Sequence, residues 1–158
     1  MRAEHLKTGY EQVFTVMDYY DRPRKGIANY RGQPHLYECI FDEEKDDYSE
    51  LFQLTPLPND IFRLAMEDWT IWRQWETVFH AGQTDLSTHP ALPHDANRHA
   101  ELKRTLESSL VTDPAKAIFR VGRFEVIGES KLPKSINRQL QVEWTELRME
   151  SPCAEDVL

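Results

Sequence analysis

The sequence of 158 residues predicts an α+β fold, in which an antiparallel sheet built from both ends of the chain carries a central helical hairpin. Apolar side chains recur at every second residue within residues 11–54 and again within 115–147. Within residues 59–110 they recur at steps of three and four residues, as in amphipathic helices. Strands, then helices, then strands are typical of this fold class. We expect one domain over residues 1–158, with 148–158 as a loose tail.

The N-terminal segment reads as a meander of four strands separated by turn residues. The expected strands cover residues 11–20, 27–30, 35–41 and 48–54. Between the first two, Pro23 fixes φ and Gly26 is free to adopt a positive φ, so we expect both residues in a turn. The acidic loop DEEKDD at 42–47 reads as a solvated turn, because it lacks the glycine and the spaced oxygen ligands of a calcium loop.

The middle of the chain predicts two helices. The clearer one runs from about residue 59 to 81, with Asn59 or Asp60 as its cap and Gly82 at its end. Its apolar stripe consists of Phe62, Ala65, Met66, Trp69, Trp72 and Phe79. The second helix covers roughly residues 94 to 110, and its weaker stripe consists of Asp95, His99, Leu102, Leu106 and Leu110.

Strand-like alternation returns after residue 115 and predicts the remaining strands. Phe119 and Val121 belong to one run, in which Gly122 marks an expected bulge or bend, and Val142 and Trp144 belong to a second run. Several strands carry large apolar groups on both faces. The sheet is therefore expected to be strongly curved or to form a small part-open barrel of about six strands, with a core inside and the tryptophan-bearing helix outside.

The composition limits the classes of partner and the cellular compartment that we expect for this protein. The formal net charge of −8 disfavours nucleic acid as a partner, because affinity for nucleic acid comes from basic groups that displace counterions. Cys39 and Cys153 lie far apart in unlike surroundings, which favours reduced thiols over a disulfide framework. Neither an apolar signal segment nor a run of the ~20 apolar residues of a membrane span is apparent. We therefore expect a soluble, cytoplasmic protein without a cofactor.

Residues 18–41 hold the best candidate site. Asp18 and Glu38 each interrupt an otherwise apolar strand face, and the strand between them would separate the two carboxylates by about 10 Å if the register brings them level. Ala28 or Tyr30 would stand between them. A carboxylate on a covered face needs a cation, hydrogen bonds or a raised pKa. The candidate cation partners are Arg22, Arg24 and Arg31, and Tyr20 would help to line the cleft.

Two interpretations of this segment stay open at the level of sequence. The functional one is an acid pair, with Asp18 and Glu38 as candidate catalytic residues and the arginines as holders of an anionic substrate. The structural one is a set of ion pairs at the rim of a sheet. The register of the strands decides between them, because a slip of one residue moves a side chain to the other face.

Three tryptophans, Trp69, Trp72 and Trp75, advance by three residues along the first helix. They predict either a core of large rings or an aromatic groove that binds a partner, since tryptophan is enriched at binding surfaces. The row rotates around the helix by about 60° per step, so Trp75 is expected at the rim.

The histidines do not predict a metal site. Four of them fall between residues 80 and 99, but His94 and His99 are five residues apart and a helix turns them away from each other. Asp95 and His99 have the spacing of a helical pair. Glycine-rich phosphate loops, nucleophile elbows and paired C-x-x-C motifs are also missing from the sequence.

Two function classes fit these observations. The first is a small acidic binding or interaction module that uses its aromatic surface to hold a protein partner or a second copy of the chain. The alternative is a small enzyme or ligand-binding domain that uses a pocket of carboxylates, arginines and tyrosines on the N-terminal sheet. The basic turn at residues 22–25 with its flanking tyrosines is the sole feature that favours nucleic acid, against the overall charge.

Overall fold

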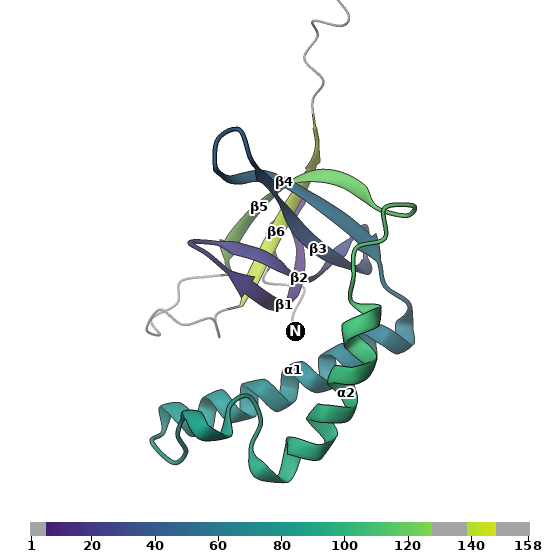
Figure 1. Ribbon diagram of the computed structural model, residues 1–158. Helices are drawn as coiled ribbons and strands as arrows, with labels where there is room; N and C mark the ends of the chain where they lie inside the picture. The colour runs from purple at the N-terminus through teal and green to yellow at the C-terminus, as the bar shows by residue number, and fades with distance from the viewer. Residues whose placement is uncertain (1–5, 128–138, 148–158) are drawn as a thin grey trace, which may run out of the picture.

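A computed structural model describes residues 6–127 and 139–147, and within them six antiparallel strands form a closed barrel (Figure 1). The strands are β1 (Glu11–Tyr19), β2 (Pro23–Tyr30), β3 (Gln33–Asp42), β4 (Asp47–Pro56), β5 (Ile118–Val126) and β6 (Leu140–Glu146). Neighbours in the chain are neighbours in the barrel, and β6 pairs back onto β1 through Glu11 and Gln12. The predicted fold class is confirmed, and the barrel closes. The expected tail at 148–158 lies outside the described residues.

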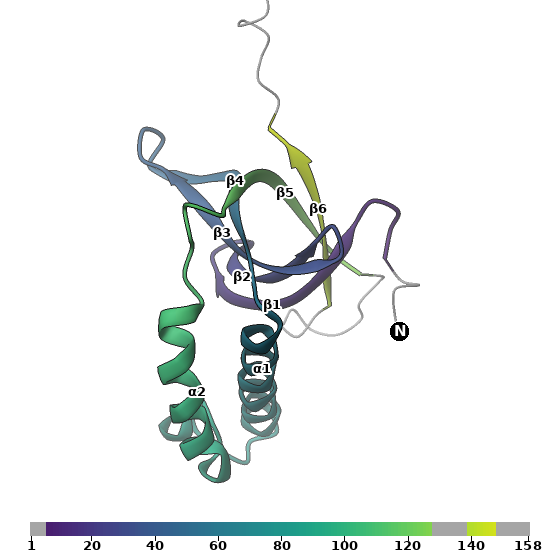
Figure 2. The same cartoon turned by 90° about the vertical axis from the view of Figure 1, so that its right-hand side faces the viewer.

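Two long helices are inserted between β4 and β5. α1 (Asn59–His80) and α2 (Ala96–Ser109) lie side by side below the barrel, joined by the short 3₁₀ helices η2 (Leu86–Thr88) and η3 (Pro93–Asp95) (Figure 2). The extended residue Pro58 precedes α1 and no side chain caps it, so the predicted asparagine or aspartate cap is wrong. The predicted end is confirmed, because Gly82 adopts a φ of 77° directly after the helix.

The inside of the barrel is filled by four aromatic rings. Tyr37, Phe52, Phe124 and Trp144 come from four different strands, and every pair of their ring centroids is 5.2 to 6.1 Å apart. Both polar groups of the cluster are satisfied: the Tyr37 hydroxyl donates to the Thr15 carbonyl at 2.9 Å, and the Trp144 indole donates to the Asn29 carbonyl at 2.9 Å. Burial also raises the pKa of Tyr37 well above its ordinary value.

Two glycines make room for this cluster. Gly26 pairs with Tyr37 across β2 and β3, and a Cβ there would overlap the Thr15 carbonyl oxygen and the Tyr37 hydroxyl. Gly122 pairs with Trp144, and a Cβ there would lie 2.5 Å from the indole ring. The prediction of Gly26 as a turn residue is therefore wrong. The turn lies earlier, where Asp21 adopts a φ of 57°, and β2 begins at Pro23.

The helical hairpin packs on the outer face of the barrel, as predicted. Ile27 of β2 and Leu36 of β3 face each other on this outer side and are buried against the helices. The helical residues of this outer core are Ala65, Ile71, Leu102, Leu106 and Leu110. The prediction from spacing that Leu102, Leu106 and Leu110 form a buried stripe is confirmed. An apolar stripe with helical spacing is stable when it packs against another element.

Charged pairs also join the two helices. Arg98 of α2 donates two hydrogen bonds to the Glu67 carboxylate of α1, at 2.7 and 2.8 Å. Beside it, His99 Nδ1 lies 2.7 Å from Asp68 Oδ1. The predicted pairing of His99 with Asp95 is wrong: Asp95 lies beside His94, at 3.3 Å. The partner of His99 is therefore Asp68 on the neighbouring helix rather than Asp95, four residues earlier in the chain.

We expect Gly26→Ala to lower the free energy of unfolding by about 3 kcal/mol or more, because the backbone of Thr15 cannot move aside as a flexible side chain would. Gly32→Ala is the matched control. Gly32 lies in open space at a φ of 77°, so its substitution costs only the backbone term of about 1 kcal/mol. Urea denaturation of both variants measures the difference. Equal losses of unfolding free energy in the two variants would contradict the close approach of Gly26 to Thr15 and Tyr37.

Candidate functional site

Asp18 and Glu38 lie level with each other on the outer face of the barrel. Asp18 pairs with Lys25 across β1 and β2, and Lys25 pairs with Glu38 across β2 and β3. Side chains opposite each other in antiparallel strands share a face, so the three groups form one row. The residue between the carboxylates is Lys25 and not Ala28 or Tyr30 as expected. The reason is that β2 already begins at Pro23 and its register with β3 sets Lys25 opposite Glu38, while register shifts in β1 bring Asp18 opposite the same lysine.

The two carboxylates nevertheless have different surroundings. Glu38 is half-buried and accepts a hydrogen bond from the Thr112 hydroxyl, which ties β3 to the segment that follows α2. Asp18 is exposed and lines a cleft between the barrel and the helices. Glu38 therefore has a structural role in this row, whereas a ligand in the cleft can reach Asp18.

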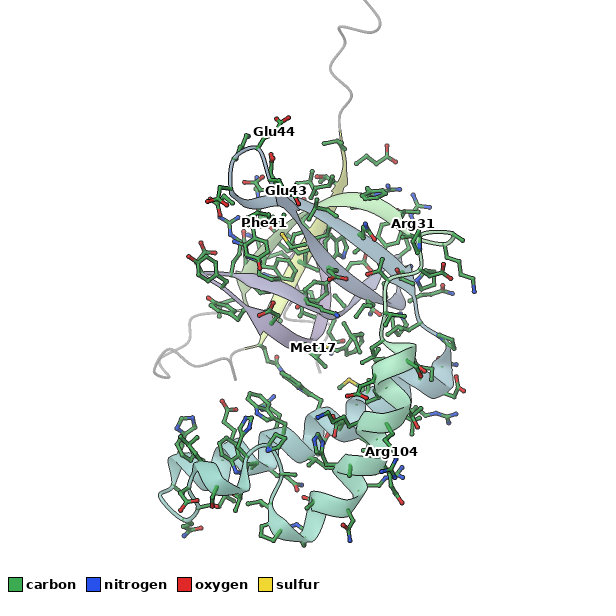
Figure 3. The ribbon with its side chains drawn as sticks, in the orientation of Figure 1. Met17, Arg31, Phe41, Glu43, Glu44 and Arg104 are labelled. Atoms are coloured by element: carbon green, nitrogen blue, oxygen red, sulfur yellow. The ribbon has the colours of Figure 1, made fainter. Side chains whose placement is uncertain are left out.

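This cleft, which we call the helix–barrel cleft, has a volume of about 430 Å³. Its barrel wall consists of Thr15, Val16, Met17, Asp18, Tyr19 and Ile27. Its helical wall consists of Ala65, Asp68, Trp69, Trp72, His89, Leu106 and Leu110. Figure 3 shows Met17 on the side of the barrel that faces the helices. The cleft is mostly apolar, with few polar groups that converge on it, which is the ordinary character of a ligand site.

Two indoles form the aromatic part of the helical wall. Trp69 and Trp72 are both half-buried, and their ring centroids are 5.0 Å apart with the planes inclined by 33°. Next to them, Asp68 is held in place by His99, whose Nδ1 contacts one of its two carboxylate oxygens. The cleft therefore combines aromatic faces with a positioned carboxylate on one wall and Asp18 on the other.

Trp75 does not lie at the rim, and its predicted position is wrong. It is only 4% exposed, its ring stacks on Phe79 at 4.9 Å, and its indole donates to the Thr88 hydroxyl at 2.8 Å. His89 closes over it, with ring centroids 4.6 Å apart. The segment between the helices folds back over this end of α1. That contact cannot be read from the rotation of side chains around a single helix.

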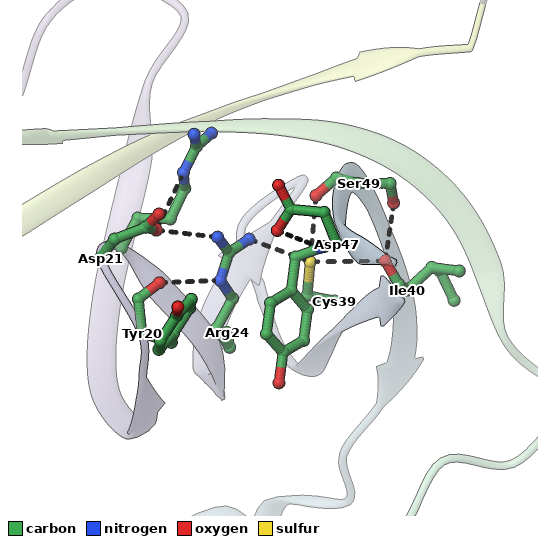
Figure 4. Close-up of polar contacts among 9 residues, drawn as sticks. Tyr20, Asp21, Arg24, Cys39, Ile40, Asp47 and Ser49 are labelled. Carbon is green, nitrogen blue, oxygen red and sulfur yellow. Dashed lines mark hydrogen bonds and ion pairs between the residues drawn. The ribbon is translucent and has the colours of Figure 1, made fainter. Parts of the chain in front are cut away.

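Arg24 is a structural residue at one end of the barrel and is not presented to a ligand (Figure 4). It is 4% exposed, and its guanidinium donates to the Tyr20 carbonyl at 3.0 Å, to Asp21 at 2.8 Å and to Cys39 Sγ at 3.3 Å. It also lies 4.3 Å from the centroid of the Tyr48 ring. A buried arginine with this many partners holds the β1–β2 turn against β3 and β4.

The other predicted binding residues do not converge on one place. Tyr20 is 63% exposed beside Tyr48. Arg22 lines a second cleft of about 420 Å³ between the β1–β2 turn and strands β5 and β6. Arg31 lies past the other end of β2, about 23 Å from Arg24 at roughly 3.3 Å per residue, where Figure 3 shows it at the edge of the barrel. A shared anion site built from these three arginines is therefore excluded by the geometry.

Sequence reasoning missed several residues of the helix–barrel cleft. Strict alternation would put Val16 on the opposite face from Met17 and Tyr19, but the register shifts of β1 break the alternation and all three residues line the cleft. Asp68 carried no recognisable motif, because its partner His99 is 31 residues away. The signals in the sequence that pointed to this place were the three-residue spacing of Trp69 and Trp72 and the position of Asp18 on an otherwise apolar strand face.

Comparison with protein-family models, with curated proteins and with solved structures gives no match for this chain. Among residues 6–127 and 139–147, no helix has the length and apolar character that crossing a membrane requires. The same residues contain no group of three histidine, cysteine or acidic side chains arranged to hold a metal ion.

We expect native Cys39 to react with iodoacetamide at least about tenfold more slowly than the same residue in urea, because the thiolate is the nucleophile. Cys39 is 8% exposed, and burial raises the pKa of its thiol more than the hydrogen bond and charge of Arg24 lower it. The measurement uses a Cys153→Ser variant and mass spectrometry over a range of pH. Similar rates in both states would contradict the buried position of Cys39.

Proposed function

We propose that this protein is a small cytoplasmic binding module, whose ligand occupies the helix–barrel cleft. The volume of about 430 Å³ falls within the usual range for small-molecule sites, which is roughly 300 to 1,000 Å³. The concave shape favours a small ligand over the flat surface of a protein partner. The two widely separated cysteines in unlike surroundings support a reducing, cytoplasmic setting.

The observation that carries the proposal is the half-exposed position of Trp69 and Trp72. A helix packed on a barrel is expected to bury its largest apolar side chains, as α1 does with Trp75. Instead, these two indoles border a cavity, at the cost of leaving apolar surface in contact with water. A ligand that covers them would recover this free energy.

The second cleft, beside Arg22, is the alternative site, and Arg22 is the one residue that it shares with the carboxylate, arginine and tyrosine pocket expected from sequence. It also has room for a ligand, at about 420 Å³. Its charges are mixed, because Arg22 and Arg123 lie among four acidic residues. One of these, Glu125, is already engaged by Lys7 and Tyr10, at 2.8 Å each. The helix–barrel cleft is the better candidate because its polar groups are fewer and it has an aromatic wall.

A neutral apolar probe, N-phenyl-1-naphthylamine, tests this proposal. We expect it to bind with enhanced emission, and Trp69→Ala and Trp72→Ala each to raise its Kd at least about tenfold, since each removes a large apolar contact. Phe119→Ala is the control, because Phe119 is an exposed aromatic residue on β5 and does not line the cleft. A probe that does not bind, or equal effects of all three substitutions, would overturn the proposal.

A further inference from the structure

The helix–barrel cleft carries negative charge on both of its walls. Asp18 comes from the barrel and Asp68 from α1, and they are the acidic side chains among the described residues of the lining. Among residues 6–127 and 139–147, neither lysine nor arginine contributes to this lining. An anionic ligand would meet two carboxylates without a cation to receive its own charge, which disfavours it.

The neighbouring positive groups only partly offset these carboxylates. His99 contacts Oδ1 of Asp68, which leaves Oδ2 as an acceptor for a ligand. Lys25 is the register neighbour of Asp18, but it lies between Asp18 and Glu38 in the row and pairs with both across the strands. Lys25 therefore has two carboxylates as cross-strand neighbours and offsets the charge of Asp18 only in part.

The aromatic side chains add a second preference for positive charge. Trp69 and Trp72 stand next to Asp68 on the same helix, and Tyr19 is a residue of the opposite wall. The faces of aromatic rings are negative, and tryptophan attracts an organic cation most strongly among them. A divalent metal ion is a poorer fit, because the described residues offer it no group of three ligands.

We infer that the ligand of the helix–barrel cleft is an organic monocation, with an ammonium or guanidinium group on an apolar body. The cationic group lies between Asp18 and Asp68 over the faces of Trp69 and Trp72, and the apolar body contacts Val16, Ile27 and Leu110. This inference rests on the proposed function, since it names the chemistry of the molecule that the cleft would take.

A matched pair of ligands tests the inference. Benzyltrimethylammonium and neopentylbenzene have the same shape and differ in a nitrogen cation against a carbon atom. Both are measured by displacement of N-phenyl-1-naphthylamine from the full chain. We expect the cation to bind at least about tenfold more tightly, and its advantage to shrink as salt is added.

Substitutions that change the charge beside the cleft test which residues attract the cationic ligand. We expect Asp18→Asn to weaken binding of the cation about threefold or more, and Lys25→Gln to tighten it by a similar factor, while neither changes binding of neopentylbenzene. Opposite signs at two neighbouring positions separate electrostatics from structural damage, which would weaken binding in both variants. Glu44→Gln is the control for net charge, because Figure 3 shows Glu44 at the opposite end of the barrel from Met17.

Three results would overturn the inference. Equal binding of the two ligands, with both sensitive to Trp72→Ala, would leave the proposed function standing and remove the cation. An effect of Glu44→Gln as large as that of Asp18→Asn would assign the attraction to the net charge of −8 rather than to the cleft. Failure of both ligands, together with a probe insensitive to the tryptophans, would remove the proposed function as well.

Discussion

The narrow interior of a six-stranded barrel is the constraint from which the rest of this structure follows. Barrels of eight strands have an interior just wide enough for side chains, so six strands leave less room. Tyr37, Phe52, Phe124 and Trp144 occupy much of that room, within 6.1 Å of one another, and Leu54 and Val142 pack in the same cluster. The strands opposite two of these rings must carry glycine, at Gly26 and Gly122. A ligand therefore has to bind outside the barrel or at its ends.

The same packing shapes the outer surface. The Thr15 carbonyl turns toward the Tyr37 hydroxyl and approaches Gly26, and β1 shifts its register on both sides of this point. The shift ends the simple alternation of β1. As a result, Val16, Met17, Asp18 and Tyr19 all line cavities or lie exposed beside the helices. A bulge near the core thus provides one wall of the proposed site, in agreement with the frequent placement of bulges next to functional sites.

The helical hairpin provides the other wall, and its attachment leaves the cleft open. Leu102, Leu106 and Leu110 anchor α2 against Ile27 and Leu36, while pairs such as Arg98–Glu67 hold α2 to α1. Trp75 is covered by the segment between the helices, whereas Trp69 and Trp72 are not. Three tryptophans on one helix therefore divide into one core residue and two candidate binding residues.

The sequence by itself determined the order of strands and helices and much of the core, because alternation and helical spacing are local properties of the chain, although β2 begins four residues earlier than predicted. It placed Tyr37, Val142 and Trp144 on strands and the leucines of α2 on a buried stripe, and the structure agrees. Only the tertiary structure decided that Lys25 separates Asp18 from Glu38, that Arg24 is buried, and that Trp75 is covered. Each of these outcomes depends on register or on a contact between distant segments. Such contacts are set by the packing of the whole molecule and leave no periodic signal in the chain.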